Sequence, residues 1–231
     1  MSVWALLAAA GCGERLGLDR PKAFAPLRGR PLLAESLERL DSSDWVDGVV
    51  VAAPLGWEEP VILLAEEVAA GKVAEVVPGC ETRAASVSAA LERIPSDAVA
   101  VLVHDAARPL LPLDVVDRVL APLGAGWDGA VPVLPVADTV KRVHDEQIVE
   151  TIDRSDLVAA QTPQGFVAER LRAALAGDLA AATDCASLVE AAGGRVTAVP
   201  GDARLLKVTD PLDLRVVEAL LGADEARGSV P

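Results

Sequence analysis

The sequence has few cysteines and no long uncharged run. Its three cysteines, Cys12, Cys80 and Cys185, are an odd number at wide spacing, and none belongs to a C-x-x-C pair. Such a pattern supports neither a disulfide framework nor a zinc site, and it favours the cytoplasm as the compartment. The longest uncharged stretch, residues 1–13, is too short to span a bilayer and lacks the basic start of a signal peptide.

Positive charge is also scarce. Lys and Arg together number 21 against 35 Asp and Glu, which gives a formal net charge of −14. This balance argues against partners such as nucleic acid or an anionic membrane. A small anionic substrate is compatible with it, provided that the few cations converge on one site. Only 4 of the 21 cations are lysines, so the position of each lysine is informative.

The 231 residues suit one domain over 1–231, and the 52% apolar content is enough for a sizeable core. Apolar runs predict strands at residues 3–8, 48–53, 73–77, 98–103, 130–134 and 196–199. Helical spacing of apolar residues lies mostly between them, at residues 31–40, 61–70, 82–94, 112–120, 168–176, 185–192 and 211–221. Continuous apolar strands that alternate with helices predict an α/β fold: a Rossmann-like, mostly parallel sheet with helices on both faces.

One segment breaks this alternation. Residues 138–153 are polar, with short alternating runs on either side of a plausible turn at 144–146. This pattern predicts a β-hairpin that protrudes from the main sheet. A two-stranded hairpin needs something to pack on, and a partner subunit is the simplest candidate.

A glycine-rich loop follows the first predicted strand, with the sequence AAGCGERLG at residues 9–17. The third glycine comes one place too late for a dinucleotide fingerprint, and no G-K-[ST] follows as in a Walker loop. Instead, Arg15 and then Lys22 come after the glycines. Small residues and exposed N–H groups with two cations behind them favour a phosphate clamp.

A second cluster of chemistry-bearing residues, HDAARP at 104–109, follows the strand predicted at 98–103. Ligands of open α/β sheets lie beyond such strand ends. Asp105 is suited to a metal ion, its waters or a hydroxyl group, and Arg108 to a phosphate. His104 without a partner is interpreted as a core histidine. Lys207, at the end of an apolar run just before a helix, is a mobile charge suited to a phosphoryl group.

Together these segments resemble a known family. The loop at 9–17 with PK at 21–22 resembles the signature of nucleotidyltransferases that activate sugars and polyols. HDAARP at 104–109, DTVKR at 138–142, QTPQGF at 161–166 and KVT at 207–209 narrow the resemblance. They are similar to the 2-C-methyl-D-erythritol 4-phosphate cytidylyltransferases of the non-mevalonate isoprenoid pathway, over about residues 3–221.

The resemblance implies a GT-A-like nucleotidyltransferase fold and a reaction. A phosphate oxygen of methylerythritol phosphate attacks the α-phosphorus of CTP, pyrophosphate leaves, and Mg²⁺ is the cofactor. Such chemistry needs positioning and charge neutralisation rather than a covalent nucleophile. The resemblance also implies a homodimer through the 138–153 arm.

The resemblance assigns roles residue by residue. Arg15, Lys22, Asp105 and Lys207 are the implied catalytic residues, with Asp105 also holding the metal directly or through water. The implied nucleotide-binding residues are Ala9, Ala10, Gly11, Gly13, Gly79, Cys80, Glu81, Ser86 and Ala106. The implied acceptor-binding residues are Arg108, Thr139, Arg154 and Thr162, of which Thr139 and Arg154 serve the neighbour's site. Cys80 and Glu81 depart from the family pattern, which has glycine and aspartate there.

Four other interpretations stay open. A ribitol 5-phosphate cytidylyltransferase has the same fold and reaction, although Lys141 and Arg142 favour methylerythritol phosphate. The first loop alone also allows a guanylyl- or other sugar nucleotidyltransferase. A regulatory nucleotide-binding protein without turnover is disfavoured by the intact catalytic cations. An NAD-dependent oxidoreductase is disfavoured by the displaced third glycine.

Overall fold

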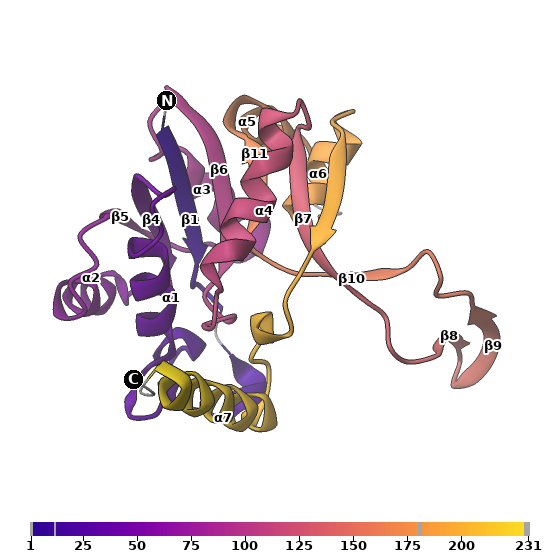
Figure 1. Ribbon diagram of the computed structural model, residues 1–231, viewed down its shortest axis with the longest axis horizontal. Helices are drawn as coiled ribbons and strands as arrows, with labels where there is room; N and C mark the ends of the chain where they lie inside the picture. Colours follow the sequence, from indigo (N-terminus) through magenta and orange to yellow (C-terminus); the bar gives the residue numbers. More distant parts are fainter. Residues whose placement is uncertain (1, 12, 180–181, 229–231) are drawn as a thin grey trace.

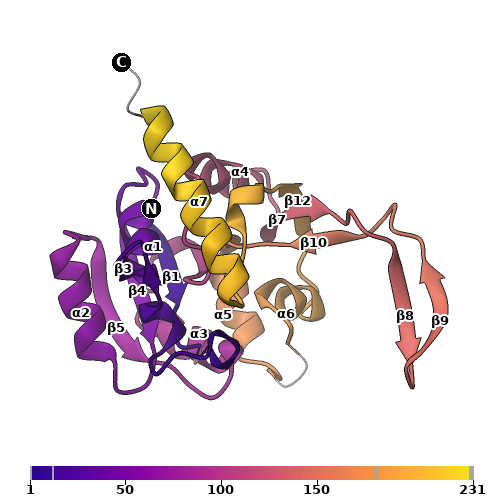
Figure 2. The ribbon, with the colours of Figure 1, turned by 90° about the horizontal axis from the view of Figure 1, so that it is seen from below.

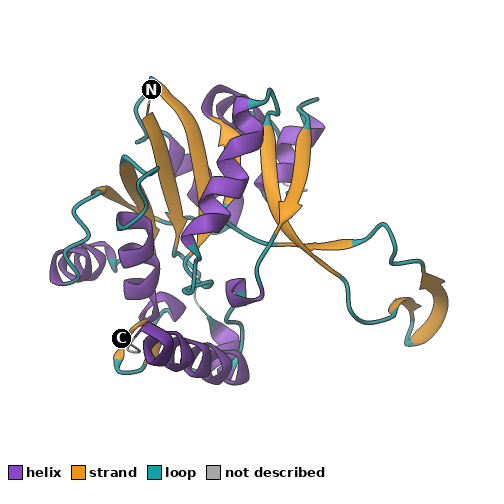
Figure 3. Cartoon of the chain, in the orientation of Figure 1, coloured by secondary structure: helices purple, strands orange, loops and turns teal. Residues whose placement is uncertain are grey.

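The central sheet of this computed structural model, which describes residues 2–11, 13–179 and 182–228, has eight strands. Its order is β10-β7-β11-β6-β1-β4-β5, and β12 also pairs with β7 (Figures 1 and 3). The strands are β1 (Ser2–Ala8), β4 (Gly48–Ala53), β5 (Val73–Pro78), β6 (Ala98–Asp105), β7 (Gly129–Pro135), β10 (Val158–Ala160), β11 (Gln164–Val167) and β12 (Val196–Pro200). Two shorter strands, β2 (Pro26–Leu27) and β3 (Arg30–Pro31), pair with each other.

Most of the sheet is parallel, which confirms the predicted fold class. The strands β1, β4, β5 and β6 are parallel neighbours, and β12 is parallel to β7. Only β10 and β11 run the other way, and they pair with successive parts of β7. These two strands were not predicted. Residues 161–163 separate β10 from β11 and lie near the carboxyl ends of the parallel strands.

Helices cover both faces of the sheet (Figures 1 and 2). On one face lie α1 (Leu32–Asp41), α2 (Glu58–Glu67) and α4 (Leu113–Gly124). On the other lie α3 (Arg83–Leu91), α5 (Ala168–Leu175) and α6 (Cys185–Ala191). The helix predicted at 61–70 begins and ends three residues earlier, the helix predicted at 211–221 continues to Gly228, and the other predicted helices overlap the observed ones.

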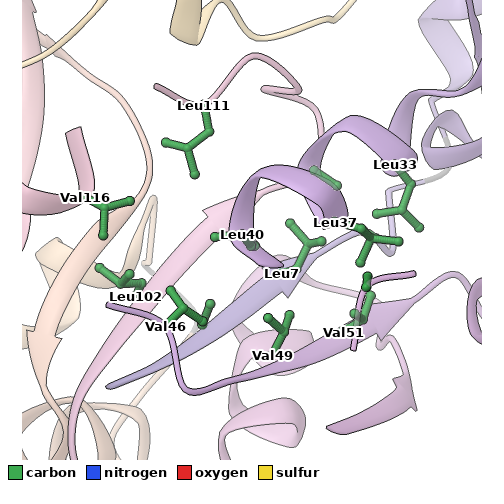
Figure 4. Close-up of a cluster of buried hydrophobic side chains, with 14 of the residues drawn as sticks. Leu7, Leu33, Leu37, Leu40, Val46, Val49, Val51, Leu102, Leu111 and Val116 are labelled. Carbon is green, nitrogen blue, oxygen red and sulfur yellow. The ribbon is translucent and has the colours of Figure 1, made fainter. Parts of the chain in front are cut away.

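Both faces of the parallel strands are buried, which explains their continuous apolar sequence. Successive side chains of a strand point to opposite faces. Leu7 and Leu102 therefore join the core beneath α1 and α4, shown in Figure 4. Their neighbours Leu6 and Val103 join the core beneath α3 and α5.

The last helix, α7 (Pro211–Gly228), lies outside these layers. Its side chains Val217 and Leu221 form a third core with Leu16 of the glycine-rich loop and Leu27 of β2. The helix thus supports the loop that follows β1. None of the helices in the described part of the chain has the length and apolar character that a membrane crossing requires.

The predicted hairpin is present and protrudes from the body, as Figures 1 and 2 show. Its strands, β8 (Val140–His144) and β9 (Gln147–Ile152), are antiparallel. The two residues between them, Asp145 and Glu146, have φ of 45° and 66°, as tight two-residue hairpin turns require. Its apolar side chains Val143 and Ile148 are more than half exposed, at 58% and 59%. Packing on a partner subunit stays a prediction.

The central position of Leu102 leads to a stability prediction. Leu102→Ala removes a fully buried side chain between β1, β11 and α4, so we expect it to lower the free energy of unfolding by about 2–5 kcal/mol. Leu55→Ala is the matched control, because Leu55 is 79% exposed and should change stability by less than about 0.5 kcal/mol. Urea unfolding followed by circular dichroism measures both. Equal effects of the two variants would contradict the placement of Leu102.

Candidate active site at the carboxyl ends of the parallel strands

The parallel strands end level with one another, which brings three loops together. Ala8, the last residue of β1, pairs with Ala52 of β4 on one side and with Asp105 of β6 on the other. Backbone hydrogen bonds continue past the strand ends: Ala106 N–H donates to Ala8 O at 3.0 Å. Likewise, Gly79 N–H donates to the carbonyl of Ala53 at 2.7 Å. The segments around residues 9–11, 79–81 and 105–107 therefore surround one space.

Two glycines allow these segments to approach closely. A Cβ on Gly79 would lie 2.2 Å from the Cβ of Ala10, so a larger residue at 79 would push the two loops apart. A Cβ on Gly13 would lie 2.6 Å from the Cβ of Lys22, and its φ of +71° also favours glycine. Gly79 and Gly13 thus set the positions of Ala10 and Lys22. Gly11 is exposed and faces open space.

The enclosed space is a cavity of about 370 Å³, a size typical of small-molecule sites. It contains most of the residues that the sequence assigned to a nucleotide. Its lining comprises Ala8, Ala9, Ala10, Gly11, Lys22, Ala23, Leu32, Cys80, Glu81, Thr82, Arg83, Ser86, Asp105, Ala106, Ala107 and Lys207. We call it the larger cavity.

Hydrogen bonds hold the loop before α3 mainly through its backbone. Cys80 N–H donates to Ser86 Oγ at 2.9 Å, and the Ser86 hydroxyl donates to the carbonyl of Thr82 at 2.9 Å. Thr82 in turn caps α3 by accepting from Ala85 N–H, which confirms the predicted helix start. The side chain of Cys80 takes no part in these bonds and is exposed. The departure from glycine at position 80 therefore leaves the loop's internal contacts intact.

A smaller cavity of about 250 Å³ adjoins the larger one. The two cavities share Arg83, Asp105 and Lys207. The rest of the lining of the smaller cavity is Arg108, Ala160, Gln161, Thr162, Gln164, Thr183 and Asp184. Two of the predicted acceptor-binding residues, Arg108 and Thr162, are in this set. A ligand in each cavity would meet the other at Asp105.

Asp105 is almost buried between two cations. Arg83 Nε donates to its Oδ1 at 2.9 Å, and Lys207 Nζ donates to its Oδ2 at 2.9 Å. Burial favours the neutral carboxyl group, but the charges of Arg83 and Lys207 outweigh it and hold the pKa of Asp105 well below its usual range. Asp105 is therefore an anion at neutral pH.

Main-chain contacts position three of the site's cations. Val208 N–H donates to Ala107 O at 2.8 Å, and this bond brings Lys207 beside β6. Lys22 Nζ donates to Val208 O at 3.2 Å, and Arg108 Nη1 donates to Leu205 O at 2.6 Å. The segment that carries Lys207 thus also fixes Lys22 and Arg108.

His104 is completely buried next to the site, and its ring connects Thr162 with the main chain of Arg108. Thr162 Oγ1 accepts from Asp105 N–H at 3.0 Å, so its own proton is free to bond to His104 Nδ1 at 3.1 Å. His104 Nε2 then carries the ring proton and donates to Arg108 O at 3.1 Å. The interpretation of His104 as a satisfied core histidine agrees with these contacts, but they also fix the Thr162 hydroxyl.

Several predicted site residues lie outside both cavities. Arg15 is exposed on a short 3-10 turn, η1 (Glu14–Leu16). Thr139 and Arg154 are exposed at the base of the hairpin, where Arg154 donates a hydrogen bond to Ala137 O. Cys12 lies outside the described residues.

Sequence reasoning left out Arg83, which lines both cavities. Its ion pair with Asp105 joins positions 22 residues apart, so only the packing of α3 against β1, the neighbour of β6, reveals it.

The carboxylate oxygens of Asp105 are suitable ligands for Mg²⁺ that is bound together with a nucleotide. Each Asp105 oxygen accepts one N–H and retains further lone-pair capacity. Over the described residues, no three His, Cys, Asp or Glu side chains gather into a group that could hold a metal ion. One carboxylate is sufficient when substrate phosphates and waters complete the shell, which is how Mg²⁺ is commonly held.

The fold and the cations gathered at its strand ends place the chain among the nucleotidyltransferases. A family model described as 2-C-methyl-D-erythritol 4-phosphate cytidylyltransferase matches residues 3–223. The chain therefore belongs to the 2-C-methyl-D-erythritol 4-phosphate cytidylyltransferase family, as the resemblance of its motifs implied.

Named relatives agree with this assignment. The curated protein of that name from Saccharopolyspora erythraea is 47% identical over 225 residues, covering 96% of this chain and all of the relative. Its counterpart from Nocardia farcinica is 46% identical over 221 residues, covering 95% and 94%. The crystal structure of the Thermus thermophilus protein is 36% identical with a TM-score of 0.77, covering 96% of this chain and 100% of that one.

The burial of His104 leads to a pH prediction. Burial lowers its pKa from 6.5 to about 4, although Asp105 and the bond to Arg108 O act against this shift; the charges of Arg108 and Arg83 add to it. Between these pH values the unfolded chain binds a proton that the folded chain does not. Stability should therefore fall by up to about 3 kcal/mol as the pH drops from 6.5 to 4.

Unfolding midpoints in urea at several pH values measure this dependence. His104→Gln should remove the part of the slope that lies between pH 6.5 and 4. His144→Gln is the matched control, since the side chain of the other histidine is exposed on the hairpin. A His104→Gln slope equal to that of the unsubstituted protein would refute the assignment.

Proposed function

We propose that this chain transfers CMP from CTP to 2-C-methyl-D-erythritol 4-phosphate, with release of pyrophosphate, in the non-mevalonate route to isoprenoids. Family membership over residues 3–223 supports the proposal. The observation that carries it is the meeting of two cavities at Asp105, Arg83 and Lys207. A transferase needs such an arrangement, because donor and acceptor must meet where charge can be neutralised.

The larger cavity is the site for CTP. Ala9, Ala10, Gly11 and Ala106 offer a small-residue surface and backbone groups, which suit close contact with a nucleotide. Cys80, Glu81 and Ser86 also line this cavity. Gly13 and Gly79 contribute indirectly, because their lack of a side chain leaves room for Lys22 and Ala10.

The smaller cavity is the site for the acceptor phosphate. Arg108 and Thr162 line it, and both are held by main-chain or buried contacts rather than by solvent-exposed ones. A guanidinium and a hydroxyl group are suited to a phosphate monoester. The acceptor's oxygen then approaches the α-phosphorus from the side of Lys207.

The reaction itself is an in-line displacement. A new bond forms between the acceptor's phosphate oxygen and the α-phosphorus, and the bond to the leaving pyrophosphate breaks. Lys22 and Lys207 line the cavity where negative charge increases, so their ammonium groups stabilise it. Arg15 lies on the loop next to this region and is proposed to close on the triphosphate. Mg²⁺ held through Asp105 would neutralise phosphate charge.

A second copy of the chain completes the proposed site. Thr139 and Arg154 lie on the protruding hairpin and outside the cavities of their own chain. The hairpin also exposes apolar side chains that a partner would cover. We therefore propose a homodimer through the 138–153 arm, in which Thr139 and Arg154 bind the acceptor in the partner's site. The cytoplasmic location stays a prediction.

Pyrophosphate release with Mg²⁺ tests the proposed function. CTP, ATP, GTP and UTP are each combined with methylerythritol phosphate and with ribitol 5-phosphate. We expect release only from CTP with methylerythritol phosphate. Release with ribitol 5-phosphate instead would keep the reaction and replace the acceptor, whereas CTP binding without release from any pair would favour a regulatory nucleotide-binding protein.

Mixing two variants that each bind the acceptor poorly tests the shared site. Arg154→Ala should raise KM for the acceptor with little effect on CTP, and Arg108→Ala should do the same. In a mixed dimer one site combines both substitutions and the other has neither. Random exchange of subunits should therefore restore about a quarter of the unsubstituted activity, because half of the dimers are mixed. No recovery after proven exchange would place both arginines in one chain's site.

A further inference from the structure

Arg83 joins three elements at the junction of the two cavities. It is the first residue of α3, its Nε donates to Asp105 Oδ1 on β6, and its Nη1 donates to Cys185 Sγ on α6 at 3.7 Å. The guanidinium is planar, so two contacts fix its orientation. Arg83 is thus held in place before any substrate binds.

Lys207, the other cation on Asp105, is held differently. Its side chain is 41% exposed, against 28% for Arg83, and its ammonium group sits at the end of a flexible stem. A rotation of that stem can redirect the ammonium into either cavity, because Lys207 lines both. Arg83 cannot turn in this way without giving up Cys185.

Substrates bring negative charge into both cavities and so compete with Asp105 for Lys207. The Asp105 side chain is only 9% exposed, so its carboxylate needs a partner that remains when Lys207 turns away. Arg83 can be that partner, because Arg83 and Lys207 bond to different oxygens of Asp105.

We propose that Arg83 is a positioning residue that holds the Asp105 carboxylate in place while Lys207 moves to the substrate phosphates. This inference rests on the proposed function, since it concerns the same transfer site. Arg83 acts through Asp105 rather than on the reacting atoms. Loss of Arg83 should therefore lower kcat, whereas the initial binding of CTP depends on the glycine-rich loop.

A double-mutant cycle tests this proposal, with pyrophosphate release and CTP binding by calorimetry as its two measurements. Arg83→Met removes the guanidinium and keeps an apolar stem. We expect kcat to fall by about 10²-fold, as for a misplaced catalytic group, with KM and Kd for CTP little changed. Arg83→Lys should recover part of kcat, because an ammonium group can reach Oδ1 but cannot also span to Cys185.

Asp105→Asn completes the cycle. If Arg83 acts through Asp105, the double variant should have nearly the kcat of Asp105→Asn alone, since the group that Arg83 positions is already lost. Arg93→Met is the matched control, because Arg93 pairs with Glu75 on the surface and should leave kcat unchanged.

Three results would overturn the inference. If the kcat losses of Arg83→Met and Asp105→Asn multiply in the double variant, Arg83 contacts the substrate independently of Asp105. A fully active Arg83→Lys would show that one simple charge is sufficient. If Arg83→Met lowers the thermal unfolding midpoint enough to account for the lost activity, the role of Arg83 is purely structural. If the unsubstituted protein released no pyrophosphate at all, the proposed function itself would fail, which none of the first three results implies.

Discussion

The pairing of β1 with β6 determines where the buried carboxylate of the site lies relative to the glycine-rich loop. Their parallel register places Ala8 opposite Asp105, so the glycine-rich loop and the buried carboxylate leave the sheet side by side. A slip of one residue would exchange the faces of His104 and Asp105. His104 would then point toward the cavities and Asp105 would lie where Thr162 and the Arg108 carbonyl now satisfy an uncharged ring. The same slip would exchange Leu102 and Val103, which each fill a different core.

The cations of the site are held mostly by main-chain oxygens and by one carboxylate. In a chain with a net charge of −14, pairing each cation with its own acidic residue would leave no positive potential for an anionic substrate. Lys22 and Arg108 donate to the carbonyls of Val208 and Leu205, which carry only partial charges. Asp105 is shared between Arg83 and Lys207. The site therefore keeps excess positive charge at the junction of two cavities, which is what two phosphorylated substrates require.

The sequence predicted those parts of the fold that depend on local burial. Strands such as β4 are apolar throughout because both faces are covered, and this pattern can be read without a structure. The segment of β10 and β11 has no such pattern: Gln161, just after β10, and Gln164, which begins β11, are buried polar residues that donate to Asp202 and Asp184, far along the chain. Arg83 could not be assigned for a similar reason, since its contact with Asp105 depends on the packing of α3 against β1, the neighbour of β6. Thr139 and Arg154 are exposed at the base of the hairpin, and their role in a partner's site stays a prediction.

The unusual residues at 80 and 81 show which parts of the nucleotide loop are constrained. Gly79 cannot gain a side chain without displacing Ala10, and Ser86 holds the backbone of Cys80 from beneath. These two contacts fix the path of the loop, and neither uses the side chains of Cys80 or Glu81. A base recognised through such a backbone presents its edges to N–H and C=O groups, which are the same for every residue type. The loop can therefore depart from the family pattern at 80 and 81 and keep its shape, whereas it could not do so at 79 or 86.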